Sequence, residues 1–146
     1  MRRTIGRLAA AAACLALAAG HSGAASADAL GTWVTDGGKS HIKIEPCGDK
    51  LCGAIVWLKE PNNKEGSAKL DVNNKDESLR SRPILGLPLL TDFAAKSASK
   101  WESGKIYNPE DGKTYRSKLE LVDPDTLKVS GCFLFFCKDQ TWTRAQ

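Results

Sequence analysis

The stretch LGTWVTDGG at residues 30–38 joins a short β-like run to a cluster of turn-forming residues. The run at residues 31–35 carries a Gly-x-Trp triplet and predicts the first strand of a β-protein. One strand does not distinguish an open sheet from a closed barrel. The pattern of the rest of the chain therefore decides the fold.

Short β-like runs alternate with turns along most of the chain. Ile42 and Ile44 alternate with polar residues, and a second alternating run extends from Thr114 to Val122. An apolar residue at every second position is typical of a strand with one buried face. Turn signals such as Asn-Pro-Glu-Asp-Gly at residues 108–112 separate the runs at hairpin spacing. About eight such runs predict an all-β fold, an eight-stranded antiparallel up-and-down barrel, because closure leaves no exposed edge.

One connection is much longer than a hairpin turn. Residues 59–82, after the third predicted strand, are polar and rich in Asn, Lys and Asp. Asp76 is placed to cap a short helical turn, and Pro83 ends it. We expect a long loop or short helix here, either as a lid or functional loop or as a solvated linker.

The first 27 residues have the features of a secretory signal peptide. Three arginines precede an apolar run at residues 8–19, and Ala25-Ser26-Ala27 is a small-x-small cleavage site. The alternative is an uncleaved anchor, which so short an apolar run disfavours. We expect cleavage after Ala27, a single barrel domain at residues 28–146 without a transmembrane segment, and a periplasmic or secreted location.

The charge balance gives no reason to expect a nucleic-acid partner. The whole chain has 21 Lys and Arg against 17 Asp and Glu, a formal charge of +4. Removing the three arginines of the leader leaves 18 basic residues against 17 acidic ones. The apparent basicity thus belongs to the predicted export signal.

The cysteines agree with export. Four remain after the leader, and an even number in a small exported chain indicates two disulfides. Of the three possible pairings, the spacing favours Cys47–Cys52 and Cys132–Cys137, each across a turn of four residues. A zinc site is the alternative, but this spacing suits zinc poorly, so no metal and no other cofactor is expected.

Five ordered stretches cover almost all of the chain after the leader. They resemble the bacterial DUF2147 family: GTW at 31–33, CGDKLCGAIVWL at 47–58, LDVNNKDESLRSRPILGLPLL at 70–90, WESGKIYNPEDGKTY at 101–115, and LKVSGC and CKDQTWTR within 127–144. The resemblance implies a calycin or lipocalin-like barrel and an envelope location, and it implies no particular activity. In calycins a basic residue of the last strand often covers the first-strand Trp. The resemblance therefore implies a structural stack of Arg144 on Trp33.

Four side chains are candidates for binding a ligand. Arg80 and Arg82, near a possible barrel mouth, suit a carboxylate or phosphate, and the alternative is a pair of salt bridges to neighbouring acids. Tyr107 and Tyr115 flank the turn at 108–112, where their hydroxyls either orient a ligand or satisfy protein groups. No catalytic constellation is visible, so an enzyme is not expected.

The apolar segment CFLFFC is a candidate for contact with a partner. Phe133, Phe135 and Phe136 lie at a predicted hairpin tip, and exposed apolar residues mark partner or membrane contacts. The alternative is that they fold back over the open barrel end. Two functions follow: an envelope protein that binds a small apolar or amphipathic ligand in its barrel, or a structural or partner-binding protein with a solidly packed barrel.

Overall fold

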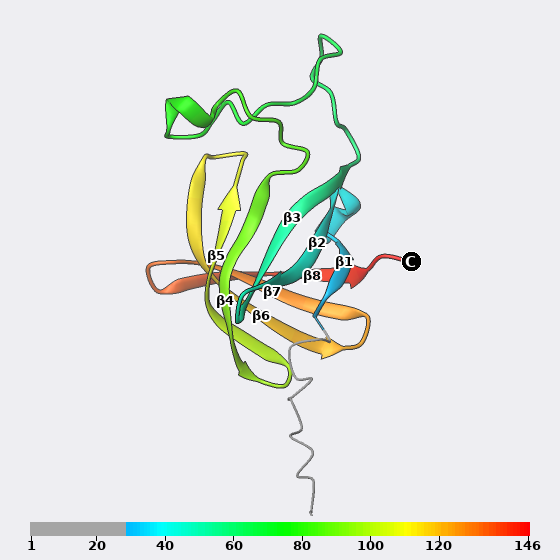
Figure 1. The fold of residues 1–146 in the computed structure, drawn as a ribbon, viewed down its shortest axis with the longest axis vertical. Helices are drawn as coiled ribbons and strands as arrows, with labels where there is room; N and C mark the ends of the chain where they lie inside the picture. The colour runs from blue at the N-terminus through cyan, green and yellow to red at the C-terminus, as the bar shows by residue number, and fades with distance from the viewer. Residues whose placement is uncertain (1–28) are drawn as a thin grey trace, which may run out of the picture.

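The computed structural model describes residues 29–146, so the predicted signal peptide at residues 1–27 lies outside the described residues. Eight strands account for most of the described chain (Figure 1). Their bounds are β1 Gly31–Val34, β2 Ser40–Cys47, β3 Lys50–Leu58, β4 Pro88–Ser97, β5 Lys100–Asn108, β6 Lys113–Asp123, β7 Thr126–Phe133 and β8 Phe136–Arg144. Two short 3-10 turns, η2 (Asp36–Gly38) and η3 (Glu77–Leu79), complete the elements.

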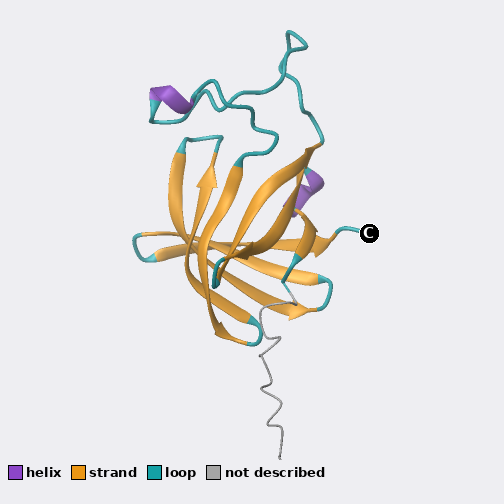
Figure 2. Cartoon of the chain, viewed as in Figure 1, coloured by secondary structure: helices purple, strands orange, loops and turns teal. Residues whose placement is uncertain are grey.

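The strands form a closed antiparallel barrel in which each strand pairs with the next, and β8 returns to β1. Figure 2 shows the barrel with one long connection above it. The predicted eight-stranded up-and-down barrel is confirmed. The long connection after β3 is also confirmed, and Asp76 caps η3 by accepting a hydrogen bond of 3.0 Å from the Ser78 backbone.

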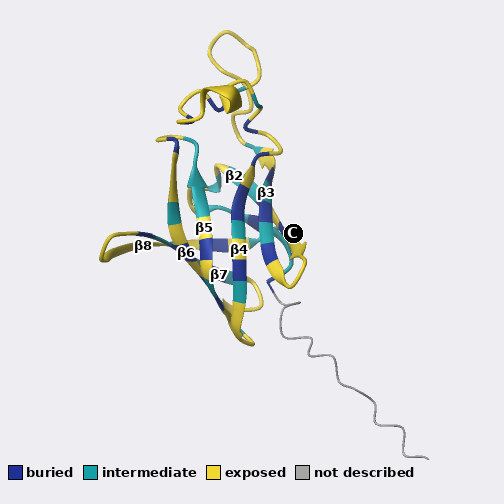
Figure 3. Ribbon diagram, turned by 60° about the vertical axis from the view of Figure 1, so that its left-hand side comes forward, coloured by how far each residue is buried: buried dark blue, intermediate teal, exposed yellow. Residues whose placement is uncertain are grey.

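Large apolar side chains fill the inner face of the barrel. Trp33, Trp101, Trp142 and Phe93 are all at most 1% exposed, and Ile42 and Ile44 are buried as their alternation predicted. Figure 3 shows buried and exposed residues alternating along the strands. These side chains belong to one continuous core, which supplies most of the driving force for folding.

The Gly-x-Trp triplet closes one end of the barrel. Trp33 lies beside Arg144 in the β1–β8 register, and the guanidinium carbon of Arg144 is 4.2 Å from the centroid of the Trp33 ring. The same guanidinium donates to the carbonyl oxygens of Leu30 and Pro124, each at 2.8 Å. Gly31 has a φ of 111°, which favours glycine, so the triplet combines a special backbone angle with a stacked indole.

The opposite end of the barrel carries the loops that differ most from simple turns. Because successive strands run in opposite directions, the connections β3–β4, β5–β6 and β7–β8 all lie at the end away from the Arg144 stack. The β3–β4 connection at residues 59–87 extends above this end (Figure 1). We call it the long loop. It lies over this end, which we call the loop end.

The structure contains both disulfides in the pairing that the spacing favoured. Cys47 is bonded to Cys52 across the β2–β3 turn, with Cα atoms 5.7 Å apart. Cys132 is bonded to Cys137 across the β7–β8 turn, with Cα atoms 4.0 Å apart. Each bond therefore clips a single hairpin.

Candidate functional site at the loop end of the barrel

A buried carboxylate joins the long loop to the barrel wall. Asp71 is completely buried, and it accepts hydrogen bonds from the Tyr107 hydroxyl at 2.6 Å and from the Asn74 amide at 2.8 Å. Its third partner is Arg82, whose Nε lies 2.9 Å away. The Arg82 guanidinium also lies over the Tyr107 ring, 5.5 Å from its centroid. We call these four residues the Asp71 latch.

The latch holds Asp71 in its charged form. Burial raises the pKa of the Asp71 carboxyl, but the hydrogen bonds from its three partners and the charge of Arg82 outweigh burial and lower that pKa below its usual value. Burial and the bond to Asp71 raise the pKa of Tyr107, which keeps its hydroxyl a donor. A buried charge is tolerated only when it is paired and hydrogen-bonded, as here. The latch therefore fixes the loop onto β5.

A second contact fixes the same loop to the β5–β6 turn. The Asn73 amide donates to the carbonyl oxygens of Pro109 and Glu110, at 3.2 and 3.1 Å. The Asn73 backbone also lies so close to Gly112 that a Cβ on Gly112 would overlap it. Gly112 has a φ of 69°, so its conformation and its surroundings both require glycine.

The structure brings together two of the four predicted ligand-binding residues. Arg82 and Tyr107 meet at Asp71, whereas Arg80 donates to the Asn74 carbonyl at 2.7 Å and pairs with Glu77 at 3.4 Å. Both arginines therefore form the salt bridges that were the alternative interpretation.

Tyr115 lies apart from the latch. In the β5–β6 register Tyr115 is opposite Ile106, and Tyr107 is opposite Thr114, so the two tyrosine rings lie on opposite faces of the sheet. The Tyr115 hydroxyl donates to Asp111, and its ring meets Phe133 edge-on, with centroids 6.4 Å apart. Tyr115 therefore belongs with the β7–β8 hairpin.

The tip of the β7–β8 hairpin is an exposed apolar surface. Phe133, Leu134, Phe135 and Phe136 are 62%, 66%, 97% and 80% exposed. They do not fold back over the barrel mouth, which was the alternative to exposure. We call residues 133–136 the Phe finger.

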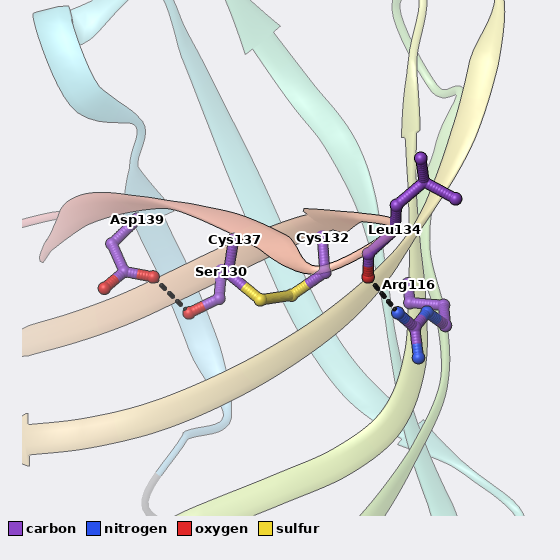
Figure 4. The surroundings of a disulfide bond; sticks show 6 residues. All are labelled: Arg116, Ser130, Cys132, Leu134, Cys137 and Asp139. Atoms are coloured by element: carbon purple, nitrogen blue, oxygen red, sulfur yellow. Dashed lines mark hydrogen bonds between the residues drawn. A yellow bond between two sulfur atoms is a disulfide. The ribbon is translucent and has the colours of Figure 1, made fainter.

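Two contacts brace the Phe finger. The Cys132–Cys137 disulfide lies directly behind it, and Arg116 donates to the Leu134 carbonyl at 2.8 Å (Figure 4). Leu134 has a φ of 53°, a left-handed conformation that costs a residue with a Cβ about 1–2 kcal/mol. The finger therefore keeps a large apolar side chain where glycine or asparagine would fit the turn more easily.

The comparisons with known proteins agree with this architecture. The family described as "Uncharacterized protein conserved in bacteria (DUF2147)" matches residues 31–144. The chain belongs to the DUF2147 family.

A solved structure shares the fold of this DUF2147 protein. It is that of protein HP1028 from the human pathogen Helicobacter pylori, which is described as belonging to the lipocalin family. The two chains are 22% identical, with a TM-score of 0.72 over 80% of this chain and 82% of the other. At this identity the likeness shows the lipocalin-like fold. No curated protein matches the chain.

Within residues 29–146, the DUF2147 protein has no group of three His, Cys, Asp or Glu side chains placed to hold a metal ion. No helix among these residues is long and apolar enough to cross a membrane. Two features characterise the loop end of the barrel, the Asp71 latch and the Phe finger.

Sequence reasoning missed the central position of Asp71 in the DUF2147 protein. Asp71 was not among the candidate binding residues that the sequence predicted. Its apolar neighbours Leu70 and Val72 are exposed while the carboxylate is buried, so the local pattern of apolar and polar residues predicts the opposite burial. The partners Arg82 and Tyr107 are 11 and 36 residues distant, and no local signal connects them to Asp71.

Proposed function

We propose that this DUF2147 protein is an exported barrel that acts by contact, docking onto another component of the cell envelope through the Phe finger. The observation that carries this proposal is the exposure of four consecutive large apolar side chains, from 62% to 97%. Exposed apolar patches of this kind mark interaction sites in soluble domains. The partner-binding alternative is thus the function that the geometry supports best.

The rigidity of the finger supports docking. A segment that is already ordered loses less conformational entropy when it binds, so the disulfide and the Arg116 bond favour association. The strained φ angle at Leu134 also supports docking, because residues in sparsely populated conformations cluster at functional sites.

Export is the second part of the proposal. Two disulfides are typical of proteins that fold in an oxidising compartment, and they are compatible with the predicted signal peptide. An envelope location also supplies the surfaces onto which a rigid apolar finger docks.

A small ligand in the barrel is the second candidate. Among the residues that the structure describes, Trp101 Nε1 and the Ser117 hydroxyl are buried without a hydrogen-bond partner, and both residues belong to the inner face. Buried polar atoms are usually satisfied, so these two favour a bound water or a small polar group. Three tryptophans already fill much of the same interior, which places this candidate second.

Of the four predicted ligand residues, Tyr115 is the one that we propose for this second function, since it lies on the same face as the inward Ile106. Native mass spectrometry of protein purified from its host tests it. A lumen ligand is supported if the wild type retains an added mass and Ser117→Ala lowers the fraction of protein that carries it. The mass of the bare protein in every preparation excludes such a ligand.

Retention on isolated envelopes tests the docking function. Phe135→Ser/Phe136→Ser removes apolar surface from the finger, and Leu85→Ser/Val122→Ser removes exposed apolar surface elsewhere. We expect the retained fraction of the finger variant to be at least about fivefold lower than that of the wild type, because docking buries exposed apolar area. The control variant should match the wild type. Equal retention of all three folded proteins, checked by near-ultraviolet circular dichroism, would contradict the proposal.

A further inference from the structure

We propose that the surface onto which the Phe finger docks is an anionic lipid bilayer, with the finger inserted at the bilayer interface. This inference rests on the proposed docking function and names its target. Three independent features of the β7–β8 hairpin support it: its shape, the order of its side chains and its charge.

The finger is a convex projection. Pairing between β1 and β8 is confined to Trp33↔Arg144 and Val34↔Thr143, so residues 136–142 of β8 have no strand partner on that side within the described chain, although η2 contacts β8. On the other side, pairing between β6 and β7 ends at Arg116↔Cys132. The hairpin therefore extends beyond the barrel wall, as Figure 1 shows. A narrow projection enters a fluid interface without a matching pocket, whereas a protein partner must supply a pocket of complementary shape.

The side chains change in character with distance from the tip. Leu134 and Phe135 form the turn, Phe133 and Phe136 are the pair behind it, and the Tyr115 ring stands edge-on to Phe133. Aromatic rings with a polar end prefer the boundary between the acyl chains and the headgroups. An apolar tip followed by a tyrosine thus matches the polarity of a bilayer interface.

Exposed cations flank the finger on both faces of the hairpin. Lys138 pairs with Gly131 on the inner face, and Arg116 pairs with Cys132 on the outer face. Two acids also lie near the finger and keep their negative charge: Asp139 accepts from the Ser130 hydroxyl at 2.5 Å, and Asp111 accepts from Tyr115.

Exposed Lys118 adds a further positive charge on the outer face, beside Ser130 in the β6–β7 register. Basic residues around an apolar anchor complement the negative surface of anionic lipids. This complementarity favours a membrane as the target of the finger.

Cosedimentation with protein-free vesicles tests the inference. We expect the full mature chain to bind vesicles of phosphatidylethanolamine and phosphatidylglycerol several-fold better than vesicles of phosphatidylcholine. Phe135→Ser/Phe136→Ser should lower the bound fraction about tenfold, because it removes two large apolar side chains from the interface. Lys118→Gln/Lys138→Gln leaves the Arg116 bond in place and should lower binding about threefold and weaken its salt dependence. The Leu85→Ser/Val122→Ser control should bind as the wild type does.

Each other outcome has a distinct meaning. If the wild type fails to bind anionic vesicles while its retention on whole envelopes still requires the finger, the inference is wrong, and a protein partner takes the place of the bilayer. If vesicle binding occurs but is unchanged in the finger variant, the inference is also wrong, because another surface binds the lipid. If neither vesicle binding nor envelope retention depends on the finger, the proposed function fails with it.

Discussion

The backbone carbonyl of Asn73 lies where a side-chain Cβ on Gly112 would be. Together with the two hydrogen bonds from the Asn73 amide, this close approach attaches the long loop to the β5–β6 turn. The Asp71 latch attaches the same loop to β5. Two attachments therefore hold the long loop over one end of a barrel whose other end is closed by Arg144 on Trp33.

Gly112→Ala is expected to release the loop from the turn. The substitution combines a φ of 69° with an overlap against backbone, so we expect a loss of about 2–4 kcal/mol in the free energy of unfolding. Limited proteolysis should show faster cleavage within residues 59–87. Gly48→Ala is the matched control, since Gly48 has a φ of 64° and nothing within 4 Å of its Cβ position. If both variants lose the same stability, the close approach contributes nothing.

Tyr107→Phe removes one donor from the buried Asp71 carboxylate. An unsatisfied buried charge is costly, and we expect a loss of about 1–3 kcal/mol, measured by urea unfolding. Tyr115→Phe removes a hydroxyl that bonds to the exposed Asp111, so it should have the smaller effect. A larger effect for Tyr115→Phe would show that the latch does not dominate the stability of the loop end.

The latch also predicts a dependence of stability on pH. Because the pKa of Asp71 is lower in the folded state than in the unfolded chain, its contribution is fully present above the unfolded value of about 3.9. The contribution is lost as the pH falls through the folded pKa. Asp71→Asn should therefore be less stable than the wild type near neutral pH, and the difference should shrink in acid. Unfolding curves at several pH values measure it, and a difference independent of pH would contradict the charged form of Asp71.

The two disulfides should contribute similarly to stability but differently to docking. Both close loops with a sequence separation of 5, so Cys47→Ser/Cys52→Ser and Cys132→Ser/Cys137→Ser should cost similar amounts, about 2 kcal/mol each. Only the second pair lies behind the Phe finger, and its loss should lower envelope retention at least about threefold, because the finger is then less ordered before binding. Equal retention of the two double variants would count against a preorganised finger.

Much of the fold could be predicted from the sequence because its signals are local. Alternation around Ile42 and Ile44 indicated a strand with one buried face, and short turns indicated hairpins. The closing contact between Trp33 and Arg144 is not local, and the family resemblance alone suggested it. The hairpin tip at Phe133–Phe136 was predicted from its flanking cysteines, but its exposure needed the structure.

The candidate site was harder to predict because register and long-range pairing determine it. Both tyrosines beside the β5–β6 turn were candidates for the same ligand site, yet the register places Tyr107 and Tyr115 on opposite faces. A shift of one residue reverses the face of every side chain in a strand, and the turn sequence does not fix it. Asp71 and Arg82 meet only because the loop folds back on itself.

Photocrosslinking in intact cells tests most directly the claim that the Phe finger is the docking element. The photoreactive p-benzoylphenylalanine replaces Phe135, which is 97% exposed, or Val122 at the opposite end of the barrel, which is 60% exposed. The account predicts an adduct with lipid or protein from position 135 and none from position 122. Adducts of equal yield at both positions, or none at position 135, would contradict it.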